Sequence, residues 1–222
     1  MQDEKPGMHL YKPKEELLNT ISHAFATFLS LIGLIFILLK LQGKDSVTIF
    51  AMMIFSLGLI GVYSASTLYH GTKNLLRKRI WQKVDHAMVA IILLAAAAPL
   101  LLIIASGTVA SVMLSLVFAS TAVNVALNLI SVQKYKKHSL GLLGLTVIFV
   151  ITGLIVNGRP YPKEFYSLLC AGFAVIFAGG GFYLKKSVDY THFIWHISNI
   201  IATGFLYFAF YFFVIIKCEK IY

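Results

Sequence analysis

Two pairs of polar residues, each spaced four residues apart, lie at the ends of apolar stretches of this sequence. His192 and His196 occur in HFIWH, and Ser66 and His70 occur in SASTLYH. Residues four apart project from one face of a helix, so each pair can present its side chains to one point. Three imidazoles with one open coordination position are typical of catalytic Zn²⁺, whereas a structural zinc site is usually closed by a fourth protein ligand. Iron and other metals that accept imidazole would suit the same residues.

The composition places these residues in an integral membrane protein. Of the 222 residues, 59% are hydrophobic and only 13% are charged, against about 25% charged in a typical soluble domain. The formal net charge of +10 would suggest a nucleic-acid partner for a soluble protein. Here the basic residues lie between the apolar stretches, where they contact lipid headgroups and set the topology. We therefore expect membrane lipids, and no nucleic acid, as partners.

The sequence predicts an all-α bundle of seven transmembrane helices. A helix needs about 20 apolar residues to cross the bilayer core. Seven stretches satisfy this requirement, at 21–41, 47–70, 85–105, 108–131, 140–157, 164–184 and 191–216. The chain is thereby divided into an N-terminal segment (1–20), a membrane domain (21–216) and a short tail (217–222).

The distribution of basic residues predicts the orientation of this bundle. Thirteen Lys and Arg residues lie on the side of the N-terminal segment, and six lie on the opposite side. Basic residues accumulate on the cytoplasmic side of membrane proteins. We therefore expect a multi-pass protein of the plasma membrane with a cytoplasmic N-terminus and an external C-terminus.

The polar residues converge on one face of the membrane if the chain crosses seven times. His70 ends the second span, Asp85 begins the third, and His192 and His196 begin the seventh. Odd spans start on the face where even spans end, so all four residues lie on the cytoplasmic side. Histidines four apart also arise by chance and can simply contact neighbouring helices or headgroups, but the matching depth of His70 and Asp85 favours a metal site. Asp85 would act through a metal-bound water or orient a ligand from behind.

Other polar residues near these spans have a less specific interpretation. Glu16, Asn19 and His23 surround the start of the first span. They are candidates for a layer behind the metal ligands, although polar residues also satisfy the free N–H groups of a helix start. His86 is expected to face about 100° away from Asp85 on the same helix and to serve in packing.

Four motifs in this order resemble those of the hemolysin III family, within the progestin and adiponectin receptor superfamily. They are EELLNTISH (Glu16, Asn19, Ser22, His23), SASTLYH (Ser66, His70), VDHA (Asp85) and HFIWH (His192, His196). The resemblance extends over essentially the whole chain.

The resemblance implies a specific set of roles. The His of the S-x-x-x-H motif and both His of the H-x-x-x-H motif bind zinc in that superfamily, which implies His70, His192 and His196 as zinc ligands. The family Asp reaches the metal through water, which implies that role for Asp85, with Ser66 beside it at the catalytic centre. The superfamily is also similar to alkaline ceramidases, which implies metal-assisted hydrolysis of a lipid amide.

Three functions are compatible with these residues. The first is a zinc-dependent hydrolase that acts on a lipid amide or ester near the cytoplasmic leaflet, with Asp85 as the proton acceptor. The second is a non-enzymatic sensor or regulator of membrane state, in which zinc has a structural role. The third is a cytolytic, pore-forming activity, which the uniformly apolar spans support least because a pore requires a polar lining.

Overall fold

The structure is a computed structural model that describes residues 10–105, 107–184 and 188–216. These residues form helices and loops, with one isolated antiparallel bridge between Ala105 and Gly158. The helices are α1 (Pro13–Lys40), α2 (Ser46–Gly71), α3 (Leu75–Pro99) with a π-helical continuation η1 (Leu100–Ile104), α4 (Thr108–Asn157), α5 (Lys163–Leu184) and α6 (Thr191–Phe210) with a π-helical continuation η2 (Tyr211–Ile216). The predicted all-α class is confirmed.

Six of the described helices are long and apolar enough to cross a membrane. The protein is therefore an integral, multi-pass membrane protein. The count differs from the predicted seven because α4, with 50 residues, includes both the fourth and the fifth predicted spans and the basic segment between them. The helix is interrupted at Ser131, whose φ of −161° and ψ of 110° are extended rather than helical.

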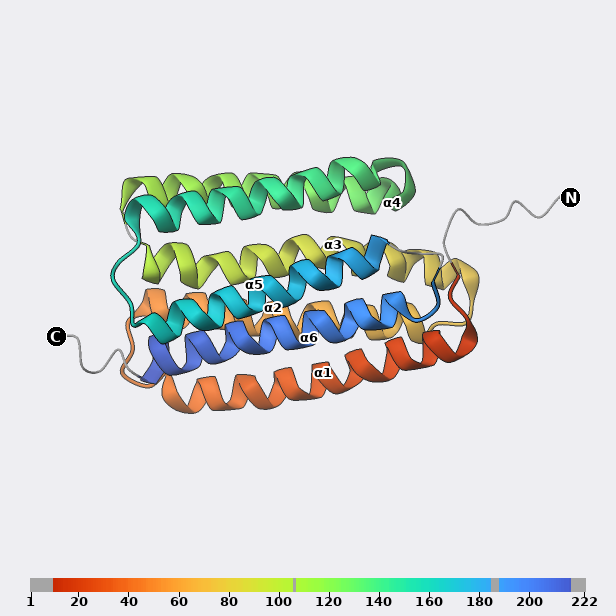
Figure 1. The fold of residues 1–222 in the computed structure, drawn as a ribbon, viewed down its shortest axis with the longest axis horizontal. Coiled ribbons are helices and arrows are strands. Elements are labelled where there is room, and N and C mark those ends of the chain that lie inside the picture. The colour runs from red at the N-terminus through yellow and green to blue at the C-terminus, as the bar shows by residue number, and fades with distance from the viewer. Residues whose placement is uncertain (1–9, 106, 185–187, 217–222) are drawn as a thin grey trace, which may run out of the picture.

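The two halves of α4 pack against each other beyond this interruption. Figure 1 shows α4 folding back on itself at the side of the bundle. The Asn124 side-chain amide donates to the Ser139 carbonyl at 2.8 Å, and the hydroxyls of Ser120 and Thr146 lie 3.0 Å apart. Such hydrogen bonds satisfy polar groups that would otherwise face hydrocarbon.

Two helices begin earlier than the sequence predicted. Helix α1 begins at Pro13 instead of 21, since a proline suits the first helical position and acidic residues in the first turn complement the helix dipole. Helix α3 begins at Leu75 instead of 85, with the Asn74 side chain accepting from the Arg77 N–H. The basic segment predicted as a loop is therefore the first part of α3. The predicted tail at 217–222 lies outside the described residues.

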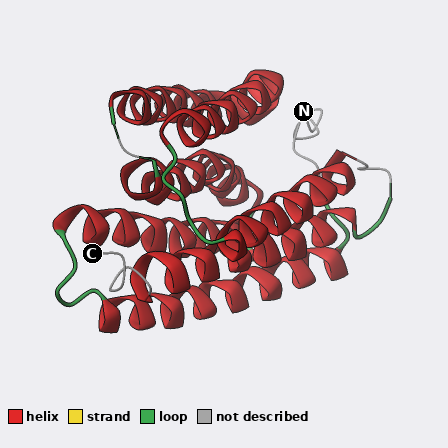
Figure 2. Ribbon diagram, turned by 60° about the vertical axis from the view of Figure 1, so that its left-hand side comes forward, coloured by secondary structure: helices red, strands yellow, loops and turns green. Residues whose placement is uncertain are grey.

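The helices bring the candidate site residues to one end of the bundle. Figures 1 and 2 show α4 on one side, against α3, while α1 packs against α2 and α6. The first turns of α1, α3 and α6 and the last turn of α2 lie at the same end, on the right of Figure 1. The convergence that the sequence predicted for these helix ends is present in the structure.

A glycine allows α2 and α3 to approach closely along this bundle. A Cβ atom built on Gly58 would lie 2.6 Å from the Ala95 Cβ and 3.2 Å from the Ile92 Cδ1. Small residues permit such close backbone approach in membrane proteins. Because Ala95 has no side-chain torsion that could relieve the clash, the two helices would have to separate.

We expect Gly58→Ala to lower the free energy of unfolding in detergent by about 1–3 kcal/mol through overpacking. The matched control is Gly141→Ala, because a Cβ at Gly141 meets no heavy atom within 4 Å. Alanine is favoured over glycine in a helix by about 1 kcal/mol, so the control should be neutral or stabilising. Thermal unfolding of the two variants measures the difference, and equal shifts would contradict the close α2–α3 packing.

Candidate metal centre

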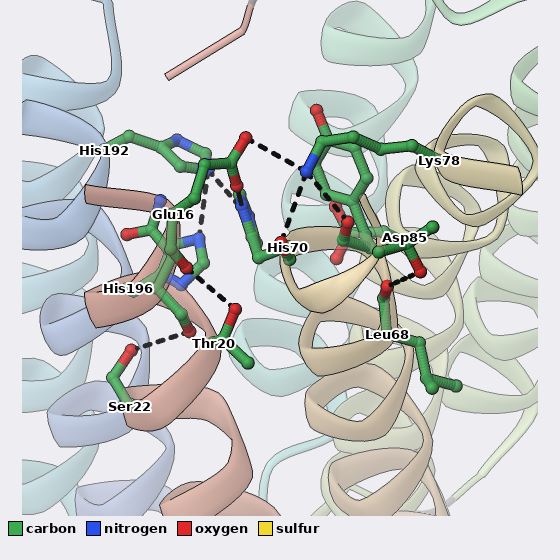
Figure 3. Close-up of polar contacts among 12 residues, drawn as sticks. Glu16, Thr20, Ser22, Leu68, His70, Lys78, Asp85, His192 and His196 are labelled. Atoms are coloured by element: carbon green, nitrogen blue, oxygen red, sulfur yellow. Dashed lines mark hydrogen bonds and ion pairs between the residues drawn. The ribbon is translucent and has the colours of Figure 1, made fainter. Parts of the chain in front are cut away.

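Three histidine side chains from two helices converge at this end of the bundle. His70 lies in the last turn of α2, and His192 and His196 lie one turn apart at the start of α6. The His192 Nε2 is 3.0 Å from the His196 Nε2 and 3.3 Å from the His70 Nε2 (Figure 3). The three residues form a group whose ligand atoms all lie within 4.8 Å of one another.

The spacing of these nitrogens fits a bound metal ion. In a tetrahedral zinc site with Zn–N bonds of about 2.0–2.1 Å, two ligand nitrogens lie about 3.3–3.4 Å apart. Each contact between two imidazole nitrogens can hold only one proton. Where three Nε2 atoms converge, hydrogen bonds alone therefore leave nitrogen lone pairs directed at one another. A shared cation would accept all three lone pairs. His70 and His196 are almost fully buried, as expected of ligands that are held rigidly.

Glu16 supports the orientation of one of these rings. Its Oε2 lies 2.6 Å from the His70 Nδ1. A carboxylate at this position favours the tautomer with the proton on Nδ1, which leaves the Nε2 lone pair available to a metal. Figure 3 shows Glu16 reaching from α1 toward both His70 and Lys78. The structure thus places Glu16 directly behind a candidate ligand.

His23 and Asn19 lie on the same helix as Glu16 and face the cluster differently. The His23 ring stacks on the His196 ring, with centroids 3.8 Å apart, and meets the Tyr63 ring edge-on at 5.1 Å. His23 therefore fixes the plane of His196 by packing. Asn19 is fully buried one turn earlier, and within the described residues its side-chain amide has no hydrogen-bond partner.

Asp85 lies near the cluster but outside the group of converging ligand atoms. Its side chain is largely buried, at 15% exposure, and interacts electrostatically with His70 and His23. His86 packs against the Tyr69 ring of α2, with centroids 6.3 Å apart, in line with its predicted packing role, but its Nδ1 also lies 3.3 Å from the Asp85 Oδ2. Adjacent backbone positions diverge on a helix, but the imidazole turns back along it, with Nδ1 also 2.9 Å from the Gln82 carbonyl.

Ser66 is buried one turn before His70 on α2. Among the hydrogen bonds recorded for the described part of the chain, none joins Ser66 to the three histidines. The structure therefore places Ser66 on the same face of α2 as His70, one turn away from it.

Two further residues at the site were missed by sequence reasoning. Lys78 is 5% exposed, and its Nζ lies 3.0 Å from the Glu16 Oε1. Asparagine is a common helix N-cap, so Asn74 was a sequence signal for a helix that begins at Leu75. That signal would have placed Lys78 in the first turn of a helix instead of in a loop that faces the headgroups. Tyr11 stacks on the His192 ring with centroids 4.3 Å apart, and no sequence signal distinguished it.

An ion pair holds the segment that contains Tyr11 near α6. The Lys12 Nζ lies 2.5 Å from the Asp189 Oδ2, and this hydrogen bond raises the pKa of Lys12. Both side chains are exposed, so the pair contributes little to stability. Its effect is local, because it joins the residues next to Tyr11 and the residues just before His192.

We expect the purified protein to bind about one divalent transition-metal ion per chain, because a single group of three imidazoles supplies the ligands. His192→Ala and His196→Ala should each lose most of the metal, measured by elemental mass spectrometry. His138→Ala is the matched control, since His138 is exposed in the turn of α4. Full occupancy in both ligand variants would refute the site.

Comparisons with known proteins identify the family of this chain. The family model described as Haemolysin-III related matches residues 11–207. A protein of Bacillus subtilis (strain 168) named Hemolysin-3 homolog is 25% identical, with 96% of this chain and 98% of that protein covered. Hemolysin-3 of Bacillus cereus is 23% identical, with 91% and 93% covered. No solved structure matches. Because the family model extends over most of the chain and includes the helices that carry the histidine cluster, the chain belongs to the haemolysin-III-related family.

Proposed function

We propose that this protein is a zinc-dependent membrane hydrolase that cleaves a lipid amide or ester near the cytoplasmic leaflet. The observation that carries the proposal is the convergence of the Nε2 atoms of His70, His192 and His196. Three imidazoles without a fourth protein ligand are the donor set of catalytic zinc sites, in which one position stays open to water or substrate. Within the described residues, the ligand group contains no fourth His, Cys, Asp or Glu.

The surrounding residues suit hydrolysis. A zinc ion at this site would supply Lewis-acid polarisation of a carbonyl and increased acidity of a water molecule. The Asp85 carboxylate would accept the proton from the attacking water, because it lies near His70 without belonging to the ligand group. The His86 Nδ1, at 3.3 Å, would orient this carboxylate. Glu16 would keep the His70 ring in the orientation that directs Nε2 toward the metal.

A lipid is the substrate class that the location favours. The site lies at the ends of membrane-spanning helices, where a scissile bond near the headgroups of a lipid would be at the correct depth. Large apolar side chains are exposed near the site on α1 and α6, including Leu17, Ile21 and Ile194. These side chains would contact acyl chains in the membrane, so a lipid could reach the site laterally.

A sensor or regulator with structural zinc is the second candidate. The cluster joins α2 to α6, whose histidines are 122 residues apart in the sequence, and His23 of α1 stacks on it. A metal ion there would tie α2 to α6 without any catalytic step, and the stacked His23 ring would add a packing contact from α1. The names of the two relatives suggest cytolysis instead. That activity is the weakest candidate, because the candidate spans are strongly apolar and an aqueous pore needs a polar lining.

We further propose that the chain crosses the membrane seven times, with a cytoplasmic N-terminus and an external C-terminus. The two halves of α4 are antiparallel and meet near Ser131, so each half would cross once. The turn between them lies at the same end of the bundle as the start of α1 (Figure 1). Lys134, Lys136 and Lys137 lie at this turn, as expected for the cytoplasmic side.

The topology can be measured with reporters fused at two positions. A reporter after Tyr222 should behave as external, and one inserted between Lys136 and Lys137 should behave as cytoplasmic. The opposite result at both positions would reverse the orientation and keep seven crossings. The same compartment at both positions would contradict the seven-crossing arrangement.

Hydrolysis can be tested directly on the purified protein. Incubation with a lipid extract should release fatty acid, detected by mass spectrometry, and a chelator should stop the release. We expect Asp85→Asn to keep its zinc, because Asp85 is not part of the ligand group, and to lose turnover by roughly 10²–10⁴-fold, the usual contribution of a general base.

The matched control is Asp45→Asn, the same chemical change at the N-cap of α2, where asparagine caps a helix as well as aspartate does. Its turnover should equal that of the wild type. Metal-independent release of fatty acid, or an Asp85→Asn variant with wild-type turnover, would contradict the hydrolase proposal. Zinc bound without any turnover on lipid would favour the sensor.

A further inference from the structure

The ammonium group of Lys78 is buried among three acceptors. Its Nζ lies 3.0 Å from the Glu16 Oε1, 3.1 Å from the Tyr69 carbonyl oxygen and 3.3 Å from the His70 carbonyl oxygen. An ammonium group has three protons to donate, so these acceptors account for all of them. Removing a charged amine from water is costly unless it is paired in this way. The position of Lys78 is therefore strongly specified by its surroundings.

Two of these acceptors belong to the end of a helix. Helix α2 ends at Gly71, so the carbonyls of Tyr69 and His70 fall among the last four, which lack partners within the helix. Lys78 supplies donors to both carbonyls from the first turn of α3. It thereby caps the turn of α2 that carries His70, and a basic side chain is also favourable near a helix C-terminus.

The third acceptor is bound to the same histidine from its other side. Glu16 uses Oε2 to contact the His70 Nδ1 at 2.6 Å and Oε1 to contact Lys78. Lys78 therefore holds the backbone of His70 directly and its imidazole through Glu16. Figure 3 shows Lys78 and Glu16 on either side of His70, from α3 and α1.

We propose that Lys78 is a positioning residue of the metal centre, and that Lys78 and Glu16 together clamp His70 with its Nε2 directed at His192 and His196. The inference rests on the metal-binding part of the proposed function and assigns a role to a residue outside the ligand set. Groups that orient metal-bound histidines affect metal affinity by about 10–100-fold.

The test compares metal affinity among variants of the full-length protein. Lys78→Met keeps an unbranched side chain and removes all three donors. We expect it to weaken zinc binding by roughly 10–100-fold in competition with a chromophoric chelator, and we expect a similar loss for Glu16→Gln. The double variant should lose less than the product of the two single losses, since both residues act through His70.

Lys83→Met is the matched control. Lys83 lies on the same helix and carries the same charge, but no ion pair or hydrogen bond of Lys83 is recorded in the described part of the structure. Its zinc affinity should equal that of the wild type. The visible spectrum of the Co²⁺-loaded protein gives a second readout, because its d–d bands report the geometry of the ligands. These bands should change in Lys78→Met and stay unchanged in Lys83→Met.

The possible failures are distinguishable. Wild-type affinity and an unchanged Co²⁺ spectrum in Lys78→Met, with metal still lost in His196→Ala, would overturn the clamp and leave the metal centre intact. A wild-type protein that binds no metal would overturn both. If Lys78→Met does not fold, Lys78→Arg replaces it, because a planar guanidinium keeps the charge but cannot place three donors on the same acceptors. Wild-type affinity in Lys78→Arg would overturn the proposal, and a measurable loss would support it.

Discussion

The structure depends on the high cost of leaving a polar group unpaired in hydrocarbon. At the end of the bundle that carries the histidines, the chain meets this cost by placing several buried ionisable side chains next to one another. The carboxylate of Glu16 meets both His70 and Lys78, and the three imidazoles meet one another. The packed apolar core of the bundle includes Phe55 and Phe210, whose rings meet edge-on with centroids 5.0 Å apart.

The grouping of the candidate ligands was predictable from the sequence because the direction of each helix alternates. His70 ends an even-numbered predicted span, and His192 and His196 begin an odd-numbered one. These positions fix the end of the bundle, and the four-residue spacing fixes the helix face. No knowledge of side-chain packing was needed for either step. The same reasoning placed Glu16 and His23 at the correct end of α1, although it could not show that Glu16 binds Nδ1 while His23 stacks.

Features set by local geometry were not predictable from hydrophobicity. Helix α3 begins at Leu75 because Asn74 caps it, so the helix includes a basic segment that apolar patterning assigns to a loop. Only a short connection then separates α2 from α3, and it returns Lys78 to the last turn of α2. In the same way, the sequence predicts two separate spans where the structure has the single helix α4, interrupted at Ser131. Hydropathy shows that the segment between the spans is polar, but not that most of it is helical. The orientation of His86 depends on side-chain torsions that sequence spacing cannot specify.

The pairing of charges separates Glu16 and Asp85, the two carboxylates discussed for the site, by their surroundings. Glu16 is bound at both oxygens, to an imidazole and to an ammonium group, so its lone pairs are directed and its charge is balanced. A carboxylate held in this way suits orientation of a neighbour better than proton transfer. Among the ion pairs of the described residues, Asp85 has one, between its Oδ2 and the His86 Nδ1 at 3.3 Å. It also interacts electrostatically with His70 but does not belong to the ligand group. Its second oxygen has no ion-pair partner among those residues, which leaves it suited to accept a proton from water. In the proposed hydrolase, the different surroundings of these carboxylates favour orientation of His70 as the role of Glu16 and proton transfer as the role of Asp85.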